Sequence, residues 1–166
     1  MDLYLVRHAL AEPRDSDRWP GDFLRPLTPV GIRVFRGVAH GLSKLGIEVD
    51  DVLSSRYARA WTTAEILQCE AHWPAPVACT ALEPGSQVSA AVEATGALAS
   101  SAVALVGHEP QLSMLASLLL SGDENRISLK LRKGGIVHLR VTSPMRSGEA
   151  ELRWSVTPKV LQQIAN

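Results

Sequence analysis

The sequence predicts an α/β fold of three layers, α/β/α, in which a mostly parallel sheet of about six strands lies between helices on both faces. Segments of strand-like and helix-like pattern alternate along the chain, as they do where helices connect parallel strands. In addition, residues 3–6 and 102–106 are short, continuous apolar runs, which is typical of strands covered on both faces. The 166 residues, 46% of them apolar, fit one domain spanning 1–166.

The predicted elements follow the apolar pattern and the turn residues. Six segments are predicted to be strands: 3–6, 49–54, 77–82, 102–106, 135–141 and 151–156. Four segments are predicted to be helices: 29–45, 57–68, 87–98 and 110–120. The polar segment 11–26 contains three prolines and is expected to be a loop. The last two strands are expected to form a closing hairpin or a pair at the sheet edge.

The first helix has the clearest signal. Thr28 is expected to cap it and Pro29 to occupy its first position. Five apolar residues then recur at helical spacing and define one expected face: Val30, Val34, Val38, Leu42 and Leu45. Gly46 is expected to end the helix.

Composition excludes several functional classes. The chain has 17 basic and 17 acidic side chains, which argues against a protein that binds a nucleic-acid backbone. The first residues do not have the pattern of a signal peptide, and the longest apolar stretch, 112–120, is far shorter than the roughly 20 residues of a membrane span. Cys69 and Cys79 lack CxxC spacing and are interpreted as free thiols. We therefore expect a cytoplasmic monomer that binds neither nucleic acid nor membrane.

Three polar clusters fall where predicted strands end. Arg7-His8 follows the first strand, residues 54–59 with Arg56 and Arg59 follow the second, and Gly107-His108-Glu109 follows the fourth. Each cluster alone is more often surface decoration than a site. However, ligands of open α/β sheets bind outside the carboxyl ends of the strands, so three clusters at that edge are expected to converge. Two of the clusters also precede helices, whose N-termini favour an anion.

A phosphate or carboxylate fits these residues better than a metal ion. Two histidines are potential metal ligands, but no acidic pair accompanies them, and the neighbouring arginines would repel a dication. Arginines that converge on one point are typical of an oxyanion site. No metal and no cofactor are therefore expected.

Five sequence motifs, in order along nearly the whole chain, resemble those of the histidine phosphatase superfamily. They are 5–9 (LVRHA), 25–31 (RPLTPVG), Ser54-Ser55 with Arg59-Ala60 and Thr63-Ala64, Val106-Gly107-His108, and Trp154 with Pro158. Together they resemble the short bacterial phosphohistidine phosphatases of SixA type, which implies a phosphoglycerate mutase-like fold and a role in bacterial signalling. One departure is Ala9, where the superfamily generally has glycine. A methyl group is expected to be tolerated there if the backbone is extended.

The resemblance implies a role for each matching residue. His8 would be the nucleophile that forms a phosphohistidine, while Arg7, Arg59 and His108 would bind the phosphoryl oxygens. Glu83 is the candidate general acid, and Glu109 and Glu12 are weaker candidates. Arg25 and Arg56 are candidates for a positive rim that meets the substrate, although solvated surface is at least as good an interpretation of each.

Two observations, less specific than the motifs, indicate the class of substrate. A poorly defined acid favours phosphohistidine, because imidazole leaves with a conjugate-acid pKa of about 6.5, whereas an alkoxide is closer to water at about 15.7. Between Arg59 and His108 there is room for one strand–helix–strand passage and for no lid or cap insertion. The expected partner is thus a phosphorylated protein. The alternatives are a small-molecule phosphomonoesterase of the same superfamily, acting on a phosphate ester, and a phosphate-binding interaction module without turnover.

Overall fold

The computed structural model describes residues 1–165 and contains one sheet of six strands. These are β1 (Asp2–Arg7), β2 (Asp51–Ser54), β3 (Val77–Ala78), β4 (Ala102–Gly107), β5 (Ile136–Arg140) and β6 (Glu151–Val156). Their order in the sheet is β3-β2-β4-β1-β5-β6. The first four strands in this order pair in parallel, whereas β5 and β6 add an antiparallel edge. The predicted α/β fold with a largely parallel sheet is confirmed.

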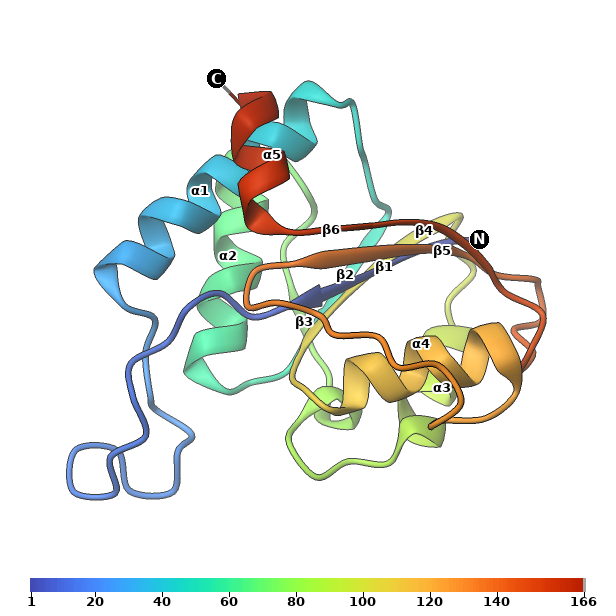
Figure 1. Cartoon of the computed structure of the whole chain (residues 1–166), viewed down its shortest axis with the longest axis horizontal. Helices are drawn as coiled ribbons and strands as arrows, with labels where there is room; N and C mark the ends of the chain where they lie inside the picture. Colours follow the sequence, from blue (N-terminus) through green and yellow to red (C-terminus); the bar gives the residue numbers. More distant parts are fainter. Residues whose placement is uncertain (166) are drawn as a thin grey trace.

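Helices cover both faces of this sheet (Figure 1). They are α1 (Pro29–Lys44), α2 (Ala58–Ala71), α3 (Val88–Gly96), α4 (Gln111–Ser121) and α5 (Pro158–Ala165). In β1, Leu3 and Leu5 belong to the core cluster shared with α3 and α4, while Tyr4 and Val6 belong to the one shared with α1, α2 and α5. This alternation follows from the two-residue period of a strand. The expected three layers are therefore present.

Helix α1 begins where the sequence predicts, but the face that it buries differs in part from the expected one. The Thr28 Oγ1 accepts a hydrogen bond from the Gly31 amide at 2.9 Å, and Pro29 occupies the first turn. The expected face is correct in its middle, at Val38 and Leu42, but wrong at its ends, since Val30 and Leu45 are 48% and 50% exposed. A helix has 3.6 residues per turn, so a series of four-residue steps drifts around the helix and leaves the buried side.

Two further predictions need correction at the edges of the fold. The strand expected at 77–82 pairs only through Val77–Ala78, and Thr80–Leu82 form a 3-10 turn, η1. The turn places Leu82 in the core, fully buried, which a continued edge strand at the sheet surface would not do. In addition, α5 follows β6 and packs against α1, where no helix was expected.

The topology brings the three polar clusters to one edge. Strands β2, β4 and β1 are adjacent and parallel, and their last residues are in register, with Arg7 opposite Gly107 and Ser54 opposite Val106. The residues that follow these strands therefore emerge side by side. None of the helices within residues 1–165 combines the length and the apolar character that a bilayer crossing requires.

Candidate active site

A cavity of about 500 Å³ lies at the carboxyl edge of the parallel strands and contains most of the predicted site residues. Five of them line it: Arg7, His8, Arg25, Arg59 and His108. Four further charged residues share the lining: Glu12, Arg14, Glu109 and Lys133. The three sequence clusters thus meet in one cavity, together with the loop 11–26.

His8 is held in one orientation and in one protonation state. Its side chain is largely buried, with 6% of the residue exposed. Nδ1 lies 2.7 Å from the carbonyl oxygen of Ala9, so Nδ1 carries the proton and donates it. Burial, together with the charges of Arg59 and Arg7, lowers the pKa of His8 to about 3 although the Ala9 carbonyl opposes this shift. At neutral pH the ring is therefore neutral, and Nε2 carries a lone pair.

The backbone after His8 is fixed by helix α2. The Ala9 amide donates to the Thr63 Oγ1 at 3.0 Å, and the same hydroxyl donates to the carbonyl of Arg59 at 2.7 Å. The Ala9 methyl group packs in the core, where the residue is 2% exposed. The alanine that replaces the usual glycine is thus accommodated.

Arg7 and Arg59 are both anchored through the terminal nitrogens of the guanidinium and have a free Nε. Arg7 donates from Nη1 to the Leu131 carbonyl at 2.8 Å. Arg59 donates from Nη1 to the Asp22 carbonyl at 3.0 Å, and its Nη2 lies 3.1 Å from the Asp22 carboxylate. The Nε of each arginine is buried and has no hydrogen-bond partner among residues 1–165. Each arginine therefore has a donor that a bound anion would satisfy.

Like the two arginines, His108 has a nitrogen with a partner and a nitrogen without one within residues 1–165. Its Nε2 lies 2.9 Å from the Ser55 Oγ, while its Nδ1 is buried without a partner within the described residues. The ring of His108 lies 5.2 Å from that of His8, centroid to centroid. Burial, and then the charge of Arg59, lowers the pKa of His108 to about 2. The ring is thus neutral at neutral pH. If the Ser55 hydroxyl donates to Nε2, the proton of the ring is on Nδ1 and faces an anion as a donor.

Asp22 connects the loop 11–26 to the site. Its carboxylate lies 2.5 Å from the Arg25 Nε and 3.1 Å from the Arg59 Nη2. Burial raises the pKa of Asp22, but the hydrogen bond from Arg25 and the charges of Arg59 and Arg25 outweigh it and hold the pKa below its ordinary value. Arg25 also donates to the Glu12 carbonyl at 2.7 Å, so the loop and the two arginines form one network.

Two predicted residues lie outside the cavity lining. The Glu83 Oε1 is 2.7 Å from the Arg56 Nε, and this pair is partly exposed beside the site. Pro84, the next residue, does reach the cavity. Glu109, by contrast, lines the cavity and accepts a hydrogen bond from the Ser113 hydroxyl at 2.6 Å.

Sequence reasoning missed four residues of the site: Asp22, Thr63, Arg14 and Lys133. Thr63 belongs to one of the five sequence motifs, but the resemblance implies no role for it. For Asp22 the only sequence signal of a contact with the site is its position three residues before Arg25. Arg14 and Lys133 come from loops whose positions follow from tertiary contacts, so no local pattern identifies them.

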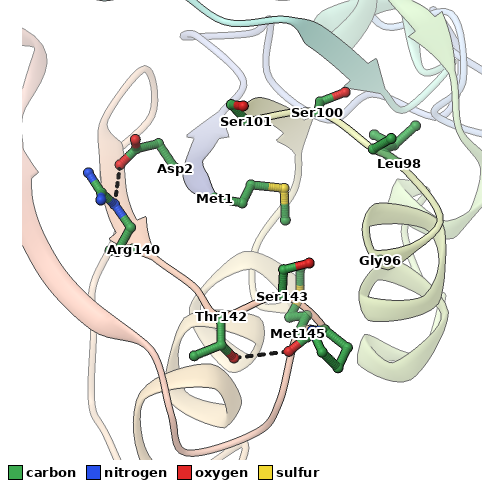
Figure 2. A pocket seen from close by; sticks show the side chains of 12 residues that line it. Met1, Asp2, Gly96, Leu98, Ser100, Ser101, Arg140, Thr142, Ser143 and Met145 are labelled. Carbon is green, nitrogen blue, oxygen red and sulfur yellow. Dashed lines mark hydrogen bonds and ion pairs between the residues drawn. The ribbon is translucent and has the colours of Figure 1, made fainter.

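A second hollow, of about 430 Å³, lies at the opposite edge of the sheet (Figure 2). Figure 2 shows Met1 beside it and Asp2 paired with Arg140 at its border. None of the predicted site residues lines it. The candidate chemistry is therefore confined to the carboxyl edge.

The chain is similar to a known family and to a curated protein. A family model described as histidine phosphatase superfamily (branch 1) matches residues 3–82. An uncharacterized protein of Picosynechococcus sp. is 35% identical over 143 residues, which cover 84% of this chain and 85% of the relative.

Solved structures show the same fold. The protein histidine phosphatase SixA complexed with tungstate has a TM-score of 0.85 at 23% identity and covers 97% of this chain and 99% of its own. A mycobacterial glucosyl-3-phosphoglycerate phosphatase in complex with VO3 has a TM-score of 0.67 at 16% identity, covering 94% and 99%. At such identities the likeness establishes the fold, while the family model carries the assignment.

Proposed function

Because the chain belongs to the histidine phosphatase superfamily and is a phosphatase, we propose that it removes the phosphoryl group from phosphohistidine on a protein through a covalent intermediate on His8. The observation that carries this proposal is a set of three buried nitrogen atoms that have no hydrogen-bond partner within residues 1–165: Arg7 Nε, Arg59 Nε and His108 Nδ1, the last a donor when Ser55 donates to Nε2. All three residues line the cavity that also contains His8. Leaving such donors unsatisfied is costly, and an oxyanion beside His8 would satisfy them.

His8 has the protonation state that a nucleophile needs. With Nδ1–H directed to the Ala9 carbonyl, the lone pair of Nε2 attacks phosphorus and the bond to the leaving group breaks, with its electron pair going to the leaving group. Water then attacks the phosphorus. The P–Nε2 bond breaks, its electron pair returns to His8, and inorganic phosphate leaves.

The two arginines and His108 stabilise the transferring group. The charge of a phosphoryl transition state spreads over three equatorial oxygens, and donors already in place cost no reorganisation. Because Arg59 is 2% exposed and His108 4% exposed, these interactions are only weakly screened by water. In this proposal the three donors stabilise the negative charge of the transition state, and no cofactor is needed for that.

The surroundings of the leaving group support phosphohistidine. Glu83 remains the predicted acid for oxygen leaving groups, but its carboxylate pairs with Arg56 outside the cavity lining. When the second ring nitrogen of the phosphohistidine carries a proton, the ring leaves as neutral imidazole, whose conjugate acid has a pKa of about 6.5, and it needs no such acid. The solved SixA structure, a protein histidine phosphatase by its description, supports the same substrate class.

A second candidate is a small-molecule phosphomonoesterase. Glu12 and Glu109 both line the cavity, and each is a candidate for the acid that would protonate an alkoxide. The mycobacterial neighbour acts on a small phosphate ester by its description.

One experiment tests the covalent step and the substrate together. The protein is mixed with a ³²P-phosphohistidine protein and with ³²P-glycerol phosphate, and each reaction is stopped with alkaline denaturant, in which a phosphohistidine bond survives. We expect label on His8 from the phosphohistidine protein, a higher kcat/KM for it, and no label on a His8→Asn variant. The variant His72→Asn, an exposed histidine at the end of α2, is the control. Label on any other residue would exclude His8 as the nucleophile, and a higher kcat/KM for glycerol phosphate would favour the second candidate.

A further inference from the structure

Three large apolar side chains are exposed on the segment that follows β1: Leu10, which lines the cavity, and Phe23 and Leu24, which directly precede the cavity residue Arg25. Leu10 is 41% exposed, Phe23 39% and Leu24 68%. Leu24 has the largest exposed fraction of the large apolar side chains that the structure describes. Single exposed apolar residues are ordinary, but a group of them beside a polar site is typical of a contact surface.

These side chains are fixed to the site by the fold. Leu10 lines the cavity itself. The ring of Phe23 lies 5.0 Å from that of Tyr57, edge to face, and Tyr57 in turn lies 5.5 Å from His108. The Ala58 amide donates to the Phe23 carbonyl at 2.9 Å. In Figure 1 the dark blue segment after β1, which includes these residues, extends outward from the body of the molecule.

Two cations of the cavity lining have no partner in the described part of the chain. Arg14 and Lys133 are exposed and line the cavity. Neither forms an ion pair among residues 1–165, although several other surface arginines do, among them Arg36, Arg56 and Arg140. The cavity lining contains five basic and two acidic side chains, and a site with such a positive excess attracts a partner of the opposite sign.

From these observations, and resting on the proposed function, we propose that Leu10, Arg14, Phe23, Leu24 and Lys133 form a docking rim for the protein that carries the phosphohistidine. The partner surface has acidic side chains around its phosphohistidine and an apolar side chain beside them. The acids meet Arg14 and Lys133, and the apolar group meets Phe23 and Leu24. A small phosphate ester would bind the buried donors and leave Leu24 in water, so the rim serves a protein substrate.

The docking rim is tested by comparing the activity of variants on protein substrates with their activity on a small substrate. The probes are two forms of one small helical protein with a single histidine phosphorylated by phosphoramidate, one with acids around that histidine and one with lysines in their place. The small probe is p-nitrophenyl phosphate. The variant is Leu24→Asp, and the matched control is Leu152→Asp, which changes a 46% exposed leucine on β6.

We expect Leu24→Asp to lower kcat/KM for the acidic phosphoprotein about tenfold or more, the effect of losing a central apolar contact and adding a repulsive charge. On p-nitrophenyl phosphate it should change kcat/KM by less than about twofold, since Leu24 does not line the cavity. The wild type should prefer the acidic over the lysine-bearing phosphoprotein, and Lys133→Glu should reduce that preference.

The outcomes separate the docking rim from the proposed function. If the wild type dephosphorylates neither phosphoprotein, the proposed function fails whatever the variants do. If it dephosphorylates the acidic one and Leu24→Asp loses no more than Leu152→Asp, the docking rim is wrong and the function stands. Equal losses of Leu24→Asp on the protein and on p-nitrophenyl phosphate would also overturn the rim, because they place the effect on the fold or the catalytic cavity.

Discussion

Asp22 carries a negative charge between Arg25 and Arg59, and we expect it to position Arg59 for catalysis. Its carboxylate and carbonyl hold both terminal nitrogens of the Arg59 guanidinium and leave Nε free. Asp22→Asn keeps a residue that tolerates its positive φ of 60° and removes the charge. The variant should lower kcat on an aryl phosphate about tenfold while KM changes less than about threefold, since the lost interaction orients a transition-state donor.

Asp17→Asn, an exposed aspartate in the same loop, is the control for the Asp22 variant and should leave both constants unchanged. Tighter inhibition by inorganic phosphate with an unchanged kcat would mean that Asp22 competes with the substrate for Arg59, which contradicts a positioning role.

Glu83 is tested by the dependence of its effect on the leaving group. The conjugate-acid pKa rises from imidazole, about 6.5, through a phenol, about 10, to an alkoxide, near 15.7. We expect Glu83→Gln to slow phosphohistidine hydrolysis by less than about twofold and an alkyl phosphate by about 10²–10⁴-fold, with an aryl phosphate between them. Measurement of kcat/KM on the three substrates for Glu83→Gln, Glu12→Gln and Glu109→Gln identifies the acid. Equal losses on all three substrates would show that Glu83 acts on the site's structure instead.

At the scale of single residues, the sequence predicts side chains that belong to motifs. Arg7, His8, Arg59 and His108 follow strands and helix starts that local patterns identify, so their convergence follows from the topology. The contacts of Asp22 depend on how the end of the loop 11–26 packs against the first residues of α2. A loop without periodicity contains no local signal for such a contact.

Among the elements, α1 and α5 make a contact that depends on one glycine. A Cβ added at Gly41 would lie 2.2 Å from the Leu161 carbonyl oxygen, so Gly41→Ala must displace α5. We expect the free energy of unfolding to fall by about 1–3 kcal/mol, as overpacking typically costs. Gly37→Ala, one turn earlier in α1, meets only the flexible Gln162 side chain at 3.1 Å and should gain up to about 1 kcal/mol from helix propensity. Urea unfolding of both variants checks this, and equal stabilities would contradict it.

Helix α5 and strand β3 differ from the sequence prediction because a local pattern contains no information about tertiary packing. Thr157-Pro158 repeats the Thr28-Pro29 pattern that correctly located α1, yet α5 is only eight residues long and buries Leu161 alone among its described side chains. An apolar stripe this short has too few repeats to be recognised. After β3, the mostly apolar pattern continues to residue 82 as it would in a strand, but the chain turns at Thr80 to bury Leu82. This tertiary effect overrides β-propensity.

For the whole molecule, two buried neutral histidines predict that acid weakens the fold. In the unfolded chain a histidine has a pKa of about 6.5, whereas burial lowers the pKa of His8 to about 3 and that of His108 to about 2. As the pH falls below the unfolded value, the unfolded state therefore binds protons that the folded state does not. The free energy of unfolding is unaffected by these two groups above about pH 6.5, and it should fall by about 1.4 kcal/mol per pH unit for each of them down to the folded values.

The measurement is urea unfolding followed by circular dichroism between about pH 6 and pH 5, a window above the range in which Asp2 and Asp22, with their lowered pKa values, contribute. We expect His8→Asn and His108→Asn each to remove about half of the pH slope, because each deletes one of the two groups that must gain a proton on unfolding. His72→Asn, which deletes an exposed histidine, should keep the wild-type slope. A wild-type stability that stays flat over this window would contradict the burial of both rings in their neutral form, and with it the neutral nucleophile on which the proposed mechanism depends.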